Sequence, residues 1–213
     1  MNFLPSATVL IAFTAAGLLL AATPGPDMAL FLSKTIGLGR GHGFAALAGA
    51  MAGLLVHTCA AAFGLSALLA ASANAYSVVK AIGALYLLWL AYGALRHGAA
   101  LRLEGQKSGP TSFGRSFLTG LVINLTNPKI ILFFVTFLPQ FISAGDADAS
   151  GKFLFLGLMF IAIGSVFCSG LILIASRFVA AARSSPRALR WFDYGFAGLM
   201  GAFAARLVWS QGK

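Results

Sequence analysis

The chain has 213 residues, of which 59% are hydrophobic and only 9% are charged. Soluble globular domains carry a far larger share of charged residues, so this composition predicts an integral membrane protein that crosses the bilayer several times. The formal net charge of +10 does not indicate nucleic-acid binding, because the basic residues are dispersed between apolar segments. In such positions they set membrane topology and contact anionic lipids.

Six apolar segments are long enough to cross a bilayer as helices, which takes about 20 residues each. They comprise residues 6–33, 43–68, 74–95, 113–142, 152–177 and 190–209. The expected fold is therefore an all-α integral membrane protein with three helices in residues 1–96, a polar cytoplasmic linker at 97–112, and three helices in 113–213. Lys and Arg are more frequent after the first, third and fifth segments, which places those loops in the cytoplasm and both termini outside.

The first segment is interrupted by the run Thr23-Pro24-Gly25-Pro26-Asp27. Proline lacks the amide hydrogen that a helix needs and clashes with the preceding turn, so this run breaks the helix and releases carbonyl groups. A broken helix with a charge at membrane depth is tolerated only where it lines a cavity or is buried in protein. The run therefore predicts a functional site.

The fourth segment contains a matching interruption at residues 126–129. Shifting the chain by 102 residues places Pro26 on Pro128 and Asp27 on Lys129. Three helices in each half would insert the two halves in opposite orientations. The pattern therefore predicts an inverted repeat whose first and fourth helices are broken at proline and meet near the membrane centre.

Opposite charges at corresponding positions predict that Asp27 and Lys129 pair with each other or bind a substrate that has both an ammonium group and a carboxylate. The expected ligand is thus small and zwitterionic. Free N–H groups at the helix starts would bind its carboxylate, and unwound carbonyl groups would accept from its ammonium. The alternative is that proline only kinks both helices and that the two charges lie at loop ends.

Three further polar residues are candidates for substrate binding or coupling. Asn124 and Asn127 lie beside the second break, and an amide side chain can both donate and accept hydrogen bonds. His57 lies within the second segment, and we expect it either to couple proton movement to transport or to form an ordinary hydrogen bond with a neighbour.

The sequence resembles the LysE/RhtB family of amino-acid exporters in four stretches that occur in the right order: residues 23–27, 49–65, 80–87 and 117–141. The resemblance implies a multi-pass protein of the bacterial inner membrane with six helices in two inverted halves. It also implies export of amino acids or close derivatives, driven by proton exchange, with a homodimer as a candidate assembly. Neutral substrates of the homoserine or threonine type are favoured, because the spans contain few acidic residues to bind a second ammonium group.

Other functions compete with this interpretation. An exporter of divalent metal ions or another small solute has a similar architecture, but metal ions require clustered carboxylates, imidazoles or thiolates, and Lys129 would repel a cation. A transmembrane thiol–disulfide carrier needs two thiols that can meet, whereas Cys59 and Cys168 lie in the second and fifth segments, away from both breaks. We predict neither a cofactor nor an enzymatic activity, and a membrane scaffold would not explain the matched breaks.

Overall fold

The computed structural model describes residues 5–67, 111–142 and 146–184 without a gap, together with separate helical positions between residues 78 and 96 and between 190 and 205. Every element in these described parts is helical. Only separate positions of the predicted segments 74–95 and 190–209, and only residues 111 and 112 of the linker 97–112, are described, so these expectations stay predictions.

The first predicted span forms a broken helix. Helix α1 covers Ala7–Ala22 and helix α2 covers Pro26–Leu38, with a bend of 54° between them. Helix α1 starts where the Ser6 side chain accepts from the backbone N–H of Val9, which satisfies one of the free donors of its first turn. Pro26 is the first residue of α2, where a missing N–H is harmless.

Helix α3 covers Arg40–Ala60 and continues through a π-helical turn, η1, at Ala61–Leu65. It follows α2 after a sharp turn at Gly39, whose φ of 95° lies in the left-handed region that favours glycine. The predicted second span at 43–68 therefore begins three residues earlier than expected, because this one glycine is enough to reverse the chain.

The fourth predicted span is also a broken helix. Helix α6 covers Phe113–Thr126, helix α7 covers Pro128–Leu132, and the chain continues through η2, Phe133–Phe137, and η3, Leu138–Phe141. The bend between the two parts is 50°. The structure thus confirms a break at proline in both predicted segments.

Helix α8 covers Ala149–Leu173, and a separate helix α9 covers Ala175–Ser184. The end of the predicted span 152–177 is therefore wrong. The chain leaves the α8 helix at Ile174, and α9 is amphipathic, with one side of its first turns packed on α2 and α8. Apolarity alone did not separate the end of one helix from the start of the next.

The described helices have the lengths and composition of a membrane protein. Residues 40–65 and 149–173 are each long and apolar enough to cross a membrane, and the two bent pairs also qualify if each is one span. Four of the six predicted spans thus fall on such a helix or bent pair.

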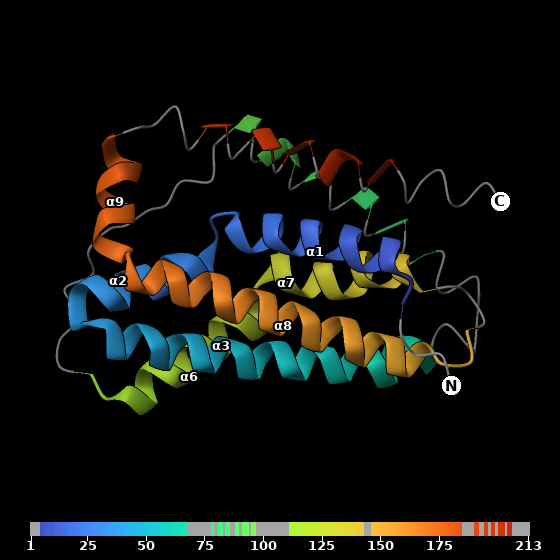
Figure 1. Ribbon diagram of the computed structural model, residues 1–213, viewed down its shortest axis with the longest axis horizontal. Helices are drawn as coiled ribbons and strands as arrows, with labels where there is room; N and C mark the ends of the chain where they lie inside the picture. Colours follow the sequence, from blue (N-terminus) through green and yellow to red (C-terminus); the bar gives the residue numbers. More distant parts are fainter. Residues whose placement is uncertain are drawn as a thin grey trace.

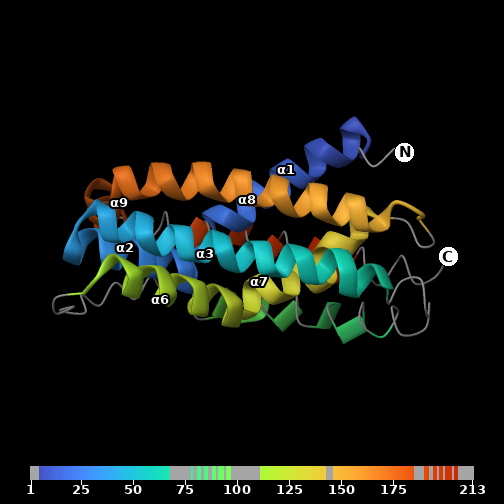
Figure 2. The same ribbon diagram turned by 90° about the horizontal axis from the view of Figure 1, so that it is seen from below.

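The two broken helices run in opposite directions along the long axis of the molecule (Figure 1). From α1 to α2 the chain runs toward the end where α9 lies, and from α6 to α7 it runs away from that end (Figures 1 and 2). Both breaks fall near the middle of this axis. The full-length helices α3 and α8 lie alongside and complete the surroundings of the breaks.

Glycines allow α3 and α6 to pack with their backbones in contact. A Cβ atom added to Gly49 would lie 1.9 Å from the carbonyl oxygen of Phe117, and one added to Gly120 would lie 2.0 Å from that of Ala46. Real Cβ atoms cannot approach so closely, so both positions require glycine. This packing brings the end of α6 against the middle of α3, where His57 is only a few residues away.

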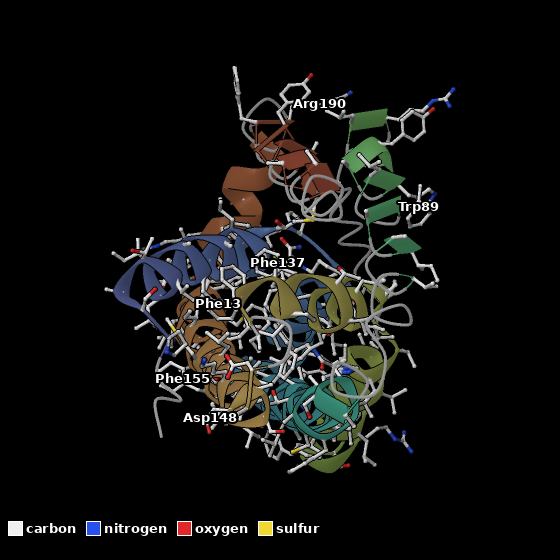
Figure 3. All side chains as sticks on the ribbon, turned by 90° about the vertical axis from the view of Figure 1, so that its right-hand side faces the viewer. Phe13, Trp89, Phe137, Asp148, Phe155 and Arg190 are labelled. Carbon is white, nitrogen blue, oxygen red and sulfur yellow. The ribbon has the colours of Figure 1, made fainter. Side chains whose placement is uncertain are left out.

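Aromatic side chains fill the core between the breaks and one end of the molecule. Phe13 of α1 faces Phe137 of η2 in the view along the long axis (Figure 3), with ring centroids 6.4 Å apart. Phe133 packs against Phe160 of α8 at 4.3 Å. These buried rings hold α1, the second broken helix and α8 together.

Candidate functional site

Asp27 connects the two broken helices. It is the second residue of α2, and its Oδ2 atom accepts hydrogen bonds from the side-chain amides of Asn124, at 3.1 Å, and Asn127, at 2.9 Å. Asn124 lies in the last turn of α6 and Asn127 caps the start of α7. The second break therefore provides both donors for a carboxylate from the first.

Lys129 makes the reciprocal connection. Its ammonium group donates to the backbone carbonyl oxygens of Leu20, at 3.2 Å, and Thr23, at 3.0 Å. The Leu20 carbonyl cannot pair with residue 24, because Pro24 has no N–H, and besides Lys129 it accepts from the backbone N–H of Thr23, at 3.2 Å. A Cβ atom on Gly25 would lie 3.2 Å from the Lys129 Nζ atom, so the absence of a side chain there gives the lysine room to reach the break.

This arrangement corrects the expected pairing of Asp27 with Lys129. The two side chains form no ion pair within 4.0 Å; among the described residues, such a pair joins Lys152 to Asp146 instead. Each charge at the breaks is bound by uncharged groups of the opposite half. The released carbonyls and the asparagine amides are polar groups that need partners of their own, and they bind the Lys129 ammonium and the Oδ2 atom of Asp27 in place of a direct contact.

Two further expectations about the breaks need the same correction. The carbonyl groups expected to accept from a substrate ammonium already accept from the protein's own lysine. At the start of α7, the backbone N–H of Lys129 donates to the Asn127 side-chain oxygen, at 3.0 Å, so it is not free for a substrate carboxylate, whereas no side chain caps the start of α2. These groups of the breaks therefore already form hydrogen bonds within the protein.

Two oxygen atoms of the site accept no hydrogen bond within the described structure. The Oδ1 atoms of Asp27 and Asn124 are both buried and have no hydrogen-bond partner in the described structure. Leaving a buried acceptor unpaired is unfavourable by about 1–3 kcal/mol, and by more for a charged group. The Asp27 Oδ1 atom can therefore accept a hydrogen bond from a bound ligand, whereas the Asn124 Oδ1 atom lies against Gly53 of α3.

A cavity of about 50 Å³ lies at the breaks. A cavity needs roughly 10–15 Å³ of this volume for each water molecule, so this one holds a few waters or a compact polar group of similar size. Its polar lining comes from Thr23, Asp27, Asn124 and Lys129. The remaining wall is mostly apolar, which is typical of a site where a few polar groups orient a small ligand.

His57 lies beside this cavity and does not line it. Its Nε2 atom is 3.4 Å from the backbone carbonyl oxygen of Asn124, and its ring stacks on Phe134 with centroids 5.6 Å apart. Gly53, one turn earlier on α3, lies against Asn124, because an added Cβ would be 2.6 Å from the Asn124 Oδ1 atom. Helix α3 therefore positions Asn124 through both residues.

The structure brings all five predicted binding residues into one region, but their roles in transport stay a prediction. Thr23 lines the cavity, and Pro24, Gly25, Pro26 and Pro128 form the two breaks. Sequence reasoning missed the wall contributed by α8, which includes the following residues: Phe160, Gly164 and Cys168. Their spacing of four residues is the only signal of a shared helix face, and it is also typical of ordinary packing.

The two cysteines are both free thiols in the structure. Cys168 is buried in α8, as expected of a small apolar side chain, and Cys59 is partly exposed on α3. Cys168 lines the cavity, whereas Cys59 does not. The expectation that both thiols lie away from the breaks is therefore wrong for Cys168, which the sequence placed only by its distance along the chain.

A family model for LysE type translocators matches residues 18–211 of the chain. The chain is 30% identical over 190 residues to the homoserine/homoserine lactone efflux protein of Salmonella typhimurium, covering 89% of this chain and 91% of that protein. It is 33% identical over 187 residues to a leucine efflux protein of Enterobacter sp., covering 87% and 88%. No solved structure matches the chain.

A further relative is the threonine efflux protein of Salmonella typhi, which is 32% identical over 197 residues and is covered to 92% of its length. The three relatives are named for different substrates but share one direction of transport. The match extends past the second break and through α8, so it includes all the elements that surround the cavity.

Proposed function

This chain belongs to the LysE family of translocators, and we propose that it exports small neutral amino acids or their close derivatives across the bacterial inner membrane. The relatives named above are efflux proteins and not enzymes, and their substrates are homoserine, its lactone, leucine and threonine. The apolar spans and bent pairs agree with a transporter built into the bilayer.

The observation that carries the proposal is the crossed arrangement of Asp27 and Lys129 in the wall of one cavity. An amino acid has an ammonium group and a carboxylate only a few ångströms apart. Its ammonium group would donate to the unpaired Oδ1 atom of Asp27. Its carboxylate would attract Lys129, whose ammonium would turn from the Leu20 and Thr23 carbonyls toward the ligand.

Such an exchange of partners suggests how substrate binding is coupled to movement. Four hydrogen bonds tie the first break to the second, two through Asp27 and two through Lys129. Substrate replaces the two bonds of Lys129, which loosens one half from the other. The halves then rock around the breaks and open the cavity alternately to each side of the membrane.

Proton exchange would supply the driving force in this proposal. Asp27 is the carboxylate at the centre of the site, and His57 reaches it through Asn124, whose side chain binds the Asp27 carboxylate while its backbone carbonyl lies by the imidazole. A proton taken up by Asp27 would weaken its hold on the substrate ammonium. His57 is therefore proposed as a relay between the site and the proton source.

We infer a membrane orientation from the basic residues at one end of the molecule. The turn between α2 and α3 lies at the same end as α9 (Figure 1), and Arg40 of that turn donates to the carbonyl of Leu173, at 2.9 Å. Lys34 and Arg177 belong to the same end. By the positive-inside rule we place this end in the cytoplasm. A homodimer is retained as the family's candidate assembly.

The test is efflux of a panel of labelled amino acids from cells or proteoliposomes that contain the protein. We expect faster loss of one or more neutral amino acids, and loss of that activity in Asp27→Asn and Lys129→Ala. Asp148→Asn is a matched control, because this residue precedes α8 and its side chain does not cap the helix. Normal efflux by either site variant would refute the proposed site.

The same panel separates the competing functions. Export of a divalent metal ion with no amino-acid efflux would support the metal-ion alternative, although the Lys129 ammonium in the cavity wall repels a cation. Loss of activity in a Cys59→Ala, Cys168→Ala double variant that retains its fold would support a thiol–disulfide carrier. No transport of any solute by protein present in the membrane would contradict all three.

A further inference from the structure

We propose that Gly164 of α8 forms the pocket for the substrate side chain and thereby limits which amino acids the protein exports. This inference rests on the proposed amino-acid export and adds a residue that determines specificity. The buried glycines of the molecule differ in how closely other atoms surround them.

Most buried glycines here lie in close packing. An added Cβ atom would lie 2.0 Å from the nearest atom at Gly43, 1.9 Å at Gly49, 2.6 Å at Gly53 and 2.4 Å at Gly157. Gly164 is also buried, yet a Cβ added there would meet no atom within 4 Å. Gly164 therefore borders empty space inside the protein, and helix packing does not explain why this position lacks a side chain.

The empty space beside Gly164 belongs to the cavity at the two breaks. Phe160, Gly164 and Cys168 lie four residues apart and share the face of α8 that lines this cavity. Phe160 is held by its packing on Phe133 at 4.3 Å, and Cys168 is buried. The glycine thus forms a notch between two fixed side chains.

The chemistry around the notch selects a neutral side chain. Asp27 and Lys129 carry the charges of the lining and would bind the ammonium and carboxylate groups common to all amino acids. The lining also includes Phe31, Met51 and Leu54, which are apolar. A second ammonium group on the substrate would find no further carboxylate among the described lining residues, so burying it there is unfavourable.

The notch therefore suits an aliphatic or small hydroxylated side chain, and its depth depends on the missing Cβ. Each carbon atom added at position 164 would occupy space that the substrate side chain needs. A large substrate loses more room than a small one, so the variants should change selectivity and not only the rate. Discrimination of roughly tenfold or more for one or two methylene groups is usual in apolar pockets.

The experiment measures efflux of leucine, threonine and alanine by wild type, Gly164→Ala and Gly164→Val. All three substrates are measured in the same preparation, so the ratio of leucine to alanine efflux does not depend on the amount of protein in the membrane. We expect this ratio to fall at least about tenfold in Gly164→Val and by less in Gly164→Ala. Gly170→Val is the matched control, because Gly170 is exposed on the same helix and its added Cβ also meets nothing within 4 Å.

Two outcomes would overturn the inference: an unchanged ratio in Gly164→Val, or the same fall in Gly170→Val. If Gly164→Val does not reach the membrane, Gly164→Ala and Cys168→Ala replace it. Cys168→Ala enlarges the notch, so the ratio should rise instead of falling. Wild-type protein that exports none of the panel would refute the proposed function, whereas wild-type export with unaltered selectivity in the variants refutes only the role of Gly164.

Discussion

The ammonium group of Lys129 donates to the backbone carbonyl of Thr23 at 3.0 Å, so a side chain from the second broken helix closes the break in the first. Asp27 makes the opposite connection by accepting from Asn127 at 2.9 Å. Each half of the site therefore depends on the other for its hydrogen bonds. A change at either charge should alter both the stability of the breaks and the binding of a substrate.

Replacement of Lys129 by methionine should abolish efflux and also lower stability. Methionine fills a similar volume but cannot donate, which leaves the carbonyl oxygen of Thr23 without the lysine, whereas that of Leu20 still accepts from the Thr23 N–H. An unsatisfied buried acceptor destabilises by about 1–3 kcal/mol. Thermal unfolding of the detergent-solubilised protein measures this loss.

Lys129→Arg is the matched comparison for that variant. Arginine keeps the charge and the donors but is bulkier, and Gly25 leaves only 3.2 Å between its Cβ position and the Lys129 Nζ atom. We expect Lys129→Arg to recover part of the stability and little of the efflux. Wild-type efflux by Lys129→Met would show that Lys129 has a purely structural role.

Substitutions at two glycines of α3 should distinguish an effect on the site from an effect on helix packing. At Gly53 an added Cβ meets the side chain of Asn124 at 2.6 Å, whereas at Gly49 it meets backbone atoms of α6 at 1.9 Å. A side chain can move and a packed backbone cannot. Gly53→Ala should therefore displace the Asn124 amide from Asp27 and reduce efflux, with a loss of stability of about 1–3 kcal/mol at most.

Gly49→Ala should instead prevent α3 and α6 from packing, so little folded protein should reach the membrane. Gly114→Ala is the control for both, since its added Cβ comes no closer than 4.0 Å to another residue. Membrane levels and efflux per molecule are measured for all three variants. Equal losses of folded protein at positions 49 and 53 would contradict this division.

The sequence predicted both breaks and the residues beside them because proline and buried charge are local signals. Pro24, Pro26 and Pro128 interrupt helices whatever surrounds them, and a charge inside an apolar segment marks a site by its position alone. These signals name the residues of the site, and the structure confirms that Asp27 and Lys129 lie in one cavity wall.

The hydrogen-bond partners of those residues could not be predicted from the sequence, because they depend on which atoms lie close together in the fold. The direct pairing of Asp27 with Lys129 followed from charge, but the nearer amides and carbonyls replaced it. The wall of α8 was missed for a similar reason. A glycine such as Gly164 looks the same in the sequence whether a neighbouring helix fills its surface or a cavity borders it.

Asn127 has two roles that a single substitution can separate. Its side-chain oxygen caps α7 by accepting from the backbone N–H of Lys129, at 3.0 Å, and its amide donates to Asp27. Asn127→Asp keeps a good helix cap but replaces the donor with a second carboxylate beside Asp27. We therefore expect α7 to stay folded and efflux to be lost, because the two like charges repel.

Asn127→Ala removes both the cap and the donor, so it should also destabilise the protein by about 1 kcal/mol through the lost cap. Comparison of thermal unfolding and efflux for the two variants checks the separation. If Asn127→Asp exports at the wild-type rate, the amide of Asn127 does not support Asp27 in transport.

Substitutions of His57 can test whether it acts through its hydrogen bond to Asn124 or by carrying a proton. Glutamine at position 57 can donate to the Asn124 carbonyl oxygen, now 3.4 Å from the His57 Nε2 atom, but it does not titrate. Proteoliposomes with an imposed pH gradient, acidic on the side that receives the substrate, should show faster efflux by wild type. We expect His57→Gln to transport substrate at the unstimulated rate and to lose the acceleration by the gradient.

His57→Phe completes this test, because phenylalanine keeps a ring against Phe134 but neither donates nor titrates. If the hydrogen bond to Asn124 matters apart from the proton, His57→Phe should fall below His57→Gln even without a gradient. Equal acceleration of wild type and His57→Gln by the gradient would remove His57 from the proton pathway. Asp27 would then remain as the carboxylate proposed to exchange protons, since it lines the cavity in contact with both asparagines.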